Sequence, residues 1–232
     1  MSRGQLLIID TATRTPVVAL ADEAGTVLGE QSWESRHRHG EELLERIDRL
    51  LAEAGTSKSD LVGVVVGTGP GSFTGLRIGL ATAKTIAYAL AIPVVGISTT
   101  VAIAHASEEA GERSDEVVVT LPAGAVDRYE HRVRLTEPLP IETDAPRLVA
   151  EPAADADGLI AIDLDAPLVS EAAIERGRQA MEGLAAALAR LGAARLTAGE
   201  ADDLAELVPA YVALPRGIAK AAAEMEWSPD LR

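Results

Sequence analysis

The order of strand-like and helix-like hydrophobic patterns in the N-terminal half constrains the fold of this chain most. Three short apolar or alternating segments come first, and then residues 41–54 repeat their apolar positions at the spacing of one helix face. Strand-like and helix-like segments alternate after that point. The predicted order is strand, strand, strand, helix, strand, helix, strand, helix, at residues 6–10, 17–21, 27–33, 41–54, 61–66, 73–90, 94–97 and 98–111.

This order predicts an α/β architecture whose mixed sheet starts antiparallel and continues through parallel crossovers, with helices on its faces. In outline it resembles one lobe of the actin-like ATPase fold (ASKHA, ribonuclease H-like). Farther along, strands are expected at residues 117–121, 128–135 and 159–162, a surface excursion at 137–157, and one long alanine-rich helix at 170–191. We therefore expect two lobes, residues 1–110 and a smaller C-terminal lobe with a tail at 111–232.

Charge and composition limit the partners that the chain can bind unaided. Residues 1–110 carry 9 basic and 13 acidic groups and residues 111–232 carry 12 and 23, so the net charge of −15 divides into −4 and −11. Because phosphate neutralisation supplies most of the affinity for nucleic acid, we expect any nucleic acid to be bound only through a partner. There is no cysteine, and the longest apolar stretch, 86–97, is shorter than the roughly 20 residues of a membrane span. We expect a cytoplasmic protein.

A glycine-rich segment, residues 67–77, joins a predicted strand to a predicted helix. A P-loop needs a lysine after its last glycine, but Leu76 follows Gly75. A dinucleotide fingerprint that starts at Gly67 would need glycine where Ser72 stands, and a nucleophile elbow at Ser72 would need glycine at Pro70. The remaining explanation is a tight strand-to-helix turn with Ser72 or Thr74 capping the helix.

The helix that follows carries small residues at positions 75, 79, 83 and 87, along one face. Two helical glycines cost about 2 kcal/mol relative to alanine, and close approach of another helix would offset this cost. Packing against the chain's own sheet is the alternative. Together with the apolar stripe of residues 41–54, this face predicts a partner interface. It comprises Leu43, Leu44, Ile47, Leu51, Gly69, Pro70, Gly71, Ser72, Phe73, Thr74, Gly75, Arg77, Gly79 and Ala83.

Two further groups are candidates for ligand binding. Asp10 and Thr11 end the first strand. In actin-like ATPases an acidic and a hydroxyl side chain at this position can face metal-bound phosphate, so Asp10 and Thr11 are candidate nucleotide contacts. A strand-end turn is the alternative for this pair. His37 and His39 precede the first helix, but His105 and His131 add no matching metal-ligand spacing, so we expect no metal.

The motifs that carry a family resemblance are Leu7 to Thr13, the run GPGSFTGLRIG from Gly69 to Gly79, and Ile92 to Ser98. With these motifs the chain resembles the TsaB (YeaZ) family, firmly over residues 5–105 and weakly afterwards. Near the C-terminus, Pro209 to Tyr211 resembles the family's Pro-x-Tyr, although Val212 and Ala213 replace its Leu-Arg.

The resemblance implies a non-catalytic scaffold or activator subunit in the synthesis of threonylcarbamoyladenosine next to the anticodon of tRNA. The implied partners are the catalytic paralogue TsaD, bound through helices 41–54 and 73–90, and the ATPase TsaE, with a homodimer when the chain is alone. The metal-binding His-x-x-x-His pair of TsaD is missing here, since no histidine follows Gly96 until His105. No tightly bound cofactor is expected, and an adenine nucleotide at the partner interface stays open.

A different class of function stays open beside this one. The chain could be a stand-alone enzyme of the actin-like or glycoprotease-like class, a peptidase or a phosphotransferase. That reading requires a base, a metal or a nucleophile that the motifs do not provide. A stand-alone tRNA binder is disfavoured by the net charge of −15.

Overall fold

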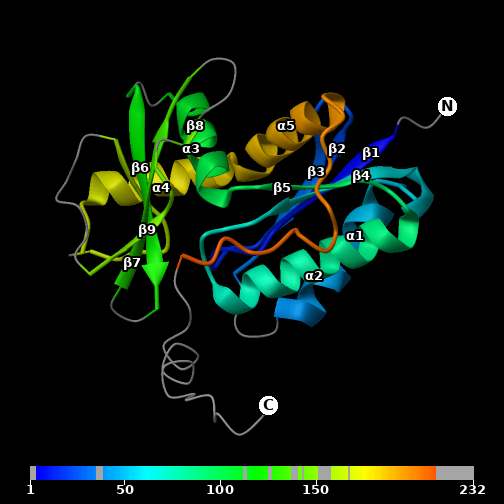
Figure 1. The fold of residues 1–232 in the computed structure, drawn as a ribbon, viewed down its shortest axis with the longest axis horizontal. Helices are drawn as coiled ribbons and strands as arrows, with labels where there is room; N and C mark the ends of the chain where they lie inside the picture. Colours follow the sequence, from blue (N-terminus) through cyan, green and yellow to red (C-terminus); the bar gives the residue numbers. More distant parts are fainter. Residues whose placement is uncertain are drawn as a thin grey trace, which may run out of the picture.

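The computed structural model describes residues 4–34, 39–111, 114–124, 127–136, 141–142, 144–150, 158–166 and 168–212. Two mixed sheets lie beside each other, and helices cover their faces (Figure 1). Among the described helices, none combines the length and the apolar character needed to cross a bilayer. His37, one of the two histidines considered above as metal ligands, and the tail after Pro215 lie outside the described residues.

The first sheet has the strand order β3-β2-β1-β4-β5. β1 pairs antiparallel with β2, β2 pairs antiparallel with β3, and β4 and β5 continue the sheet in parallel with β1. This is the antiparallel start with parallel crossovers that the sequence predicts. The strands are β1 (Gln5–Asp10), β2 (Val17–Asp22), β3 (Val27–Ser32), β4 (Leu61–Gly67) and β5 (Val94–Ile97).

Helices cover both faces of this sheet, and the alternation of β1 shows how. Leu7 and Ile9 pack in one core cluster with residues of α1 (His39–Glu53) and α2 (Phe73–Leu90). Leu6 and Ile8 point the other way, since successive side chains of a strand alternate, and pack with α3 (Thr99–Glu109) and α5 (Leu184–Thr197). Figure 1 shows α1 and α2 next to each other on the same face. A 3₁₀ turn, Lys58–Asp60, leads into β4.

The second sheet has the order β10-β6-β7-β8, and β9 also pairs with β7. Its strands are β6 (Glu116–Ala123), β7 (Asp127–Arg134), β8 (Ile141–Glu142), β9 (Arg147–Val149) and β10 (Leu159–Ala161). The stretch predicted as a surface excursion therefore contributes two short strands to this sheet. One hydrophobic core cluster runs from the first sheet through α3 and α5 to β6 and β7.

The single long helix expected at residues 170–191 is wrong. The structure has α4 (Glu171–Glu182) and then α5, separated at Gly183. Gly183 lies against Ala106 of α3, where an added Cβ would be 3.1 Å from the alanine Cβ. The break lets α4 pack on β10 and α3, while α5 returns to the first sheet. The division at residue 110 stays a proposal, because residues beyond 183 contribute to the first sheet's packing.

A C-terminal strap, residues 200–212, follows α5 along the first sheet and α2 (Figure 1). The Asp202 amide donates to the Val94 carbonyl at 2.9 Å, and the Gly96 amide donates to the Asp202 carboxylate at 2.6 Å. Leu204 and Leu207 pack against the core beneath α2. The strap thereby covers the edge of the sheet that β5 would otherwise expose.

Candidate functional site: the glycine-rich loop and the α1/α2 surface

A buried carboxylate holds the glycine-rich loop closed. Asp10, at the end of β1, is 1% exposed and accepts hydrogen bonds from the Ala12 amide at 2.8 Å and the Thr99 hydroxyl at 2.6 Å. The Thr99 hydroxyl in turn accepts from the Gly69 amide at 3.1 Å. These bonds connect the ends of β1 and β5 to the loop after β4, so the carboxylate serves to position the backbone.

The surroundings of Asp10 are too crowded for another group. Burial raises the pKa of its carboxyl to about 6, and the hydrogen bonds from Thr99 and Ala12 counteract this effect only in part. A Cβ on Gly67 would lie 1.7 Å from the nearer carboxylate oxygen. Thr11 is 2% exposed, and its hydroxyl donates to the Gly75 carbonyl at 2.7 Å. In this geometry the Asp10 carboxylate binds the Ala12 amide and the Thr99 hydroxyl, and the Thr11 hydroxyl binds the Gly75 carbonyl. The nucleotide contact of Asp10 and Thr11 stays a prediction.

The small-residue face of α2 meets Thr11 of the same chain. A Cβ on Gly75 would lie 2.1 Å from the Thr11 carbonyl oxygen, and a Cβ on Gly79 would lie 2.2 Å from the Thr11 hydroxyl. Ala83 is fully buried on the same side. Close approach does explain the two glycines, but the approaching segment follows β1. The explanation by a partner helix is wrong for this face, and packing against the own sheet is correct.

The predicted interface residues divide into an inward and an outward set. Leu43, Ile47 and Leu51 belong to the core between α1, α2 and the sheet. Gly69 and Pro70 are buried in the loop, and Gly71 is half-buried with a Cβ position 2.2 Å from the Ala12 carbonyl oxygen. The outward set consists of Leu44, Ser72, Thr74 and Arg77, with Phe73 half-buried.

Ser72 has a structural role as the N-cap of α2. Its hydroxyl accepts from the Gly75 amide at 3.2 Å, as the capping hypothesis predicts, while no such bond involves Thr74 among the described contacts. An N-cap hydroxyl satisfies one of the free amides at a helix start. The serine hydroxyl is therefore engaged in helix capping.

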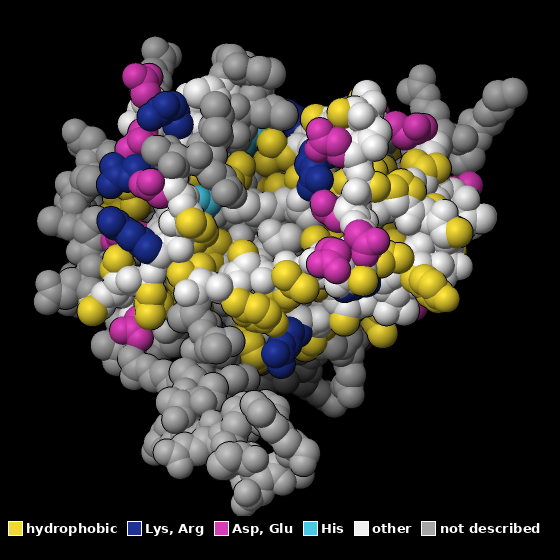
Figure 2. Space-filling view, in the orientation of Figure 1, with side chains coloured by type: hydrophobic (Ala, Val, Ile, Leu, Met, Phe, Trp, Pro, Cys, Tyr) yellow, Lys and Arg dark blue, Asp and Glu magenta, His cyan; other side chains and the backbone are white. Residues whose placement is uncertain are grey.

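The two helices present an outer face to solvent. We use this name for the exposed residues Leu44, Thr74, Arg77, Ala81, Thr85 and Tyr88. Leu44 is 55% exposed and Tyr88 is 79% exposed, which is high for large side chains of this type. Figure 2 shows hydrophobic side chains gathered along the region of α2, with Lys or Arg side chains among them. Leu44, Thr74 and Arg77 are among the interface residues predicted from the sequence, and the other three are not.

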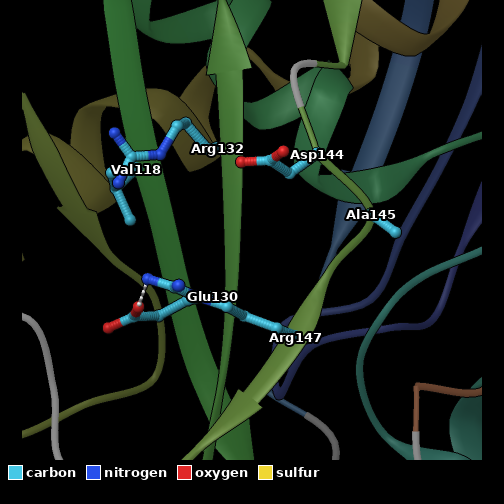
Figure 3. A pocket seen from close by; sticks show the side chains of 6 residues that line it. All are labelled: Val118, Glu130, Arg132, Asp144, Ala145 and Arg147. Atoms are coloured by element: carbon cyan, nitrogen blue, oxygen red, sulfur yellow. Dashed lines mark hydrogen bonds and ion pairs between the residues drawn. The ribbon is translucent and has the colours of Figure 1, made fainter.

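The second sheet carries a small hollow that no sequence motif predicts. It is lined by Val118, Glu130, Arg132, Asp144, Ala145 and Arg147 (Figure 3). Arg147 pairs with Glu130 at 3.2 Å, and Arg132 pairs with Glu116 at 2.8 Å. The charges compensate one another here, so the hollow has no strong preference for a cation or an anion. Within the described ranges no three His, Asp or Glu side chains form a group able to hold a metal.

Comparison with known protein families gives a match over the part of the chain that contains both helices. The family model described as "TsaD: tRNA N6-adenosine threonylcarbamoyltransferase" matches residues 27–135. A curated relative from Escherichia coli, named tRNA threonylcarbamoyladenosine biosynthesis protein TsaB, is 38% identical over 101 residues, 44% of this chain and 43% of the relative. The protein of the same name from Haemophilus influenzae is 33% identical over 134 residues, 57% of this chain and 55% of the relative. The chain thus spans about half the length of the curated relatives it matches.

A solved structure matches over nearly the whole chain. YeaZ from Pseudomonas aeruginosa superposes with a TM-score of 0.68 at 23% identity, over 90% of this chain and 99% of that one. At this identity the match shows the fold alone. The predicted α/β fold, with mixed sheets flanked by helices, is confirmed.

Proposed function

We propose that this chain belongs to the TsaB/YeaZ family and acts in the biosynthesis of threonylcarbamoyladenosine in tRNA, because curated relatives named TsaB match about half of it and it shares its fold with YeaZ. Its role is that of a non-catalytic subunit that binds a TsaD-type catalytic paralogue through the outer face of α1 and α2. The observation that carries the proposal is the family match over residues 27–135, because this range includes both helices.

The outer face has the features of a helix-docking surface. The inner sides of α1 and α2 are fixed to the sheet by buried residues such as Leu43 and Ala83, so the outer side chains have a rigid base. The exposed positions combine small residues with a few large anchors, Leu44, Arg77 and Tyr88. Helices of 15 and 18 residues supply much of the roughly 1,600 Å² that a standard interface buries.

The polar groups at the loop support a scaffold role. The Asp10 carboxylate and the Ser72 hydroxyl, which a phosphotransferase or a peptidase would need, bind backbone amides and the Thr99 hydroxyl. We therefore infer that TsaD supplies the chemistry, that TsaE is the third component, and that tRNA meets this chain only in the complex. A homodimer of the isolated chain would use the same outer face.

The experiment measures binding of the purified chain to the TsaD-type paralogue of the same organism, followed by reconstituted tRNA modification. Leu44→Asp should weaken binding at least about tenfold, because it places a charge in an apolar contact. The matched control is Leu168→Asp, which changes a leucine of similar exposure in the other half of the molecule, 47% against 55%, and should bind like wild type.

Two results would refute the proposal. One is a wild-type chain that neither binds the paralogue nor increases tRNA modification. The other is ATP turnover or peptide cleavage by the isolated chain that Asp10→Ala or Ser72→Ala abolishes, since this would favour the stand-alone enzyme.

A further inference from the structure

A cation and two aromatic rings form a cluster at the start of α2. The Arg77 guanidinium carbon lies 3.9 Å from the centre of the Phe73 ring, and the Arg77 Nε donates to the Tyr211 hydroxyl at 3.0 Å. The Phe73 and Tyr211 ring centres are 5.5 Å apart. Arg77 and Tyr211 are nevertheless exposed, Tyr211 by 41%. The cluster is therefore ordered but open to solvent on one side.

Tyr211 reaches this place because the C-terminal strap is held along its length. Near its start, the Arg195 guanidinium of α5 binds the Asp202 carboxylate through both terminal nitrogens, at 3.1 and 3.0 Å. In its middle, Lys84 Nζ of α2 donates to the Leu207 carbonyl at 3.1 Å. At its end, the Ala210 amide donates to the Thr68 carbonyl at 2.9 Å. The strap thus fixes the tyrosine hydroxyl beside the guanidinium.

The arrangement leaves one edge of the guanidinium ready for a ligand. Arg77 uses Nε for Tyr211, and its Nη1 and Nη2 make no hydrogen bond to any described residue. Two parallel N–H groups match the two oxygens of a carboxylate or phosphate. The Phe73 ring and the Tyr211 hydroxyl already hold the guanidinium in place. The Arg77 side chain therefore loses less conformational entropy when a ligand binds to it.

A protein carboxylate fits this edge better than a nucleic-acid phosphate. The chain carries a net charge of −15, which repels a polyanion but affects a single acidic side chain in a protein interface far less. Arg77 also lies on the outer face, within the proposed helix contact. We propose that Arg77 binds an Asp or Glu carboxylate of the docking partner, and that Tyr211 and the C-terminal strap position it. This inference rests on the proposed function.

The test is a double-mutant cycle on affinity for the TsaD-type paralogue, with titration calorimetry at two salt concentrations. Arg77→Lys keeps the positive charge but loses the two parallel N–H groups of the guanidinium, and it should weaken binding about tenfold. Tyr211→Phe removes only the hydroxyl and should weaken binding about threefold to fivefold. In the double variant the second change should add almost nothing, because the hydroxyl acts through Arg77. Arg178→Lys, an exposed arginine on α4, is the matched control and should bind like wild type.

Charge reversal identifies the ligand. Arg77→Glu should lose binding, and Glu→Arg or Asp→Arg at the contacting position of the paralogue should restore it. If Tyr211→Phe and Arg77→Lys bind like wild type while wild type binds well, the inference is wrong and the proposed function stands. If Arg77→Gln lowers tRNA retention by the complex but not paralogue affinity, the ligand is a phosphate and the carboxylate is refuted. A wild-type chain that does not bind the paralogue overturns the proposed function and this inference with it.

Discussion

Gly79→Ala tests directly whether the small-residue face of α2 packs against its own chain. The new methyl group would lie 2.2 Å from the Thr11 hydroxyl oxygen, well inside van der Waals contact. The Thr11 side chain would have to move, and its 2.7 Å hydrogen bond to the Gly75 carbonyl would be broken. The same substitution on a solvent-exposed helix face would instead be favourable, because alanine has the higher helix propensity.

The energies of the individual contacts predict the sign of the stability change in Gly79→Ala and its coupling to Thr11→Ala. Overpacking costs about 1–3 kcal/mol and the lost hydrogen bond about 1 kcal/mol, while helix propensity returns about 1 kcal/mol, so Gly79→Ala should destabilise by about 1–3 kcal/mol. Thr11→Ala alone should cost about 1 kcal/mol. In the double variant only the Thr11 Cβ remains, 3.4 Å from the new methyl group, and stability should return to near that of wild type. The expected coupling is therefore about 2 kcal/mol or more.

Urea unfolding of the four proteins measures this cycle, and Gly75→Ala provides the control. A Cβ at position 75 would meet the Thr11 carbonyl oxygen at 2.1 Å, which is backbone, so Thr11→Ala should not rescue it. Additive free energies for positions 11 and 79 would refute the reasoning. So would a Gly79→Ala variant that is more stable than wild type but has lost its partner, since that result would return the small-residue face to a docking role.

Three further predictions concern the loop and α1. Because burial raises the pKa of Asp10 from 3.8 to about 6, its contribution to stability is fully present below pH 4 and is lost as the pH rises to about 6. Asp10→Asn should remove that component, on the order of 3 kcal/mol, from the pH profile of the urea midpoint. Ser72→Ala should cost about 1 kcal/mol in thermal unfolding through the lost cap, against about 0.5 kcal/mol or less for Thr74→Ala. Leu43→Ala should lose about 2–5 kcal/mol, while Leu44→Ala should change stability by about 0.5 kcal/mol or less and act on partner affinity.

Much of the first sheet could be predicted from sequence because its signals are local. The apolar runs of β1 and β4 and the stripe of α1 each follow one clear period, and glycine marks several of the turns. The observed β1, β2 and β5 agree with the expected ranges to within one residue at either end. These elements can be predicted without tertiary contacts, because each face of each element is mostly apolar or mostly polar along its length.

The break at Gly183 and the C-terminal strap depend on contacts that no local pattern contains. An alanine-rich segment with one glycine is compatible with a continuous helix, and the close approach of Ala106 from α3 to Gly183 is visible only in the structure. The strap has no regular period, and Asp202, Leu207 and Ala210 are held by partners on β5, α2 and the loop. Pro209 to Tyr211 was a signal for this part, but its contact with Arg77 required the structure.

Sequence spacing alone could not separate the inner from the outer residues of the candidate site, and the reason is physical. Glycine at a helix surface signals close approach of some backbone, but it does not say whose backbone. Here the backbone after β1 takes the position, and the buried Asp10 and Thr99 fix that backbone. The proposed partner recognition would then depend on the outer face, whose side chains contribute little to stability. Variants of the inner set should therefore change affinity only as far as they unfold the protein, whereas Leu44 and Arg77 variants should change affinity at constant unfolding midpoint.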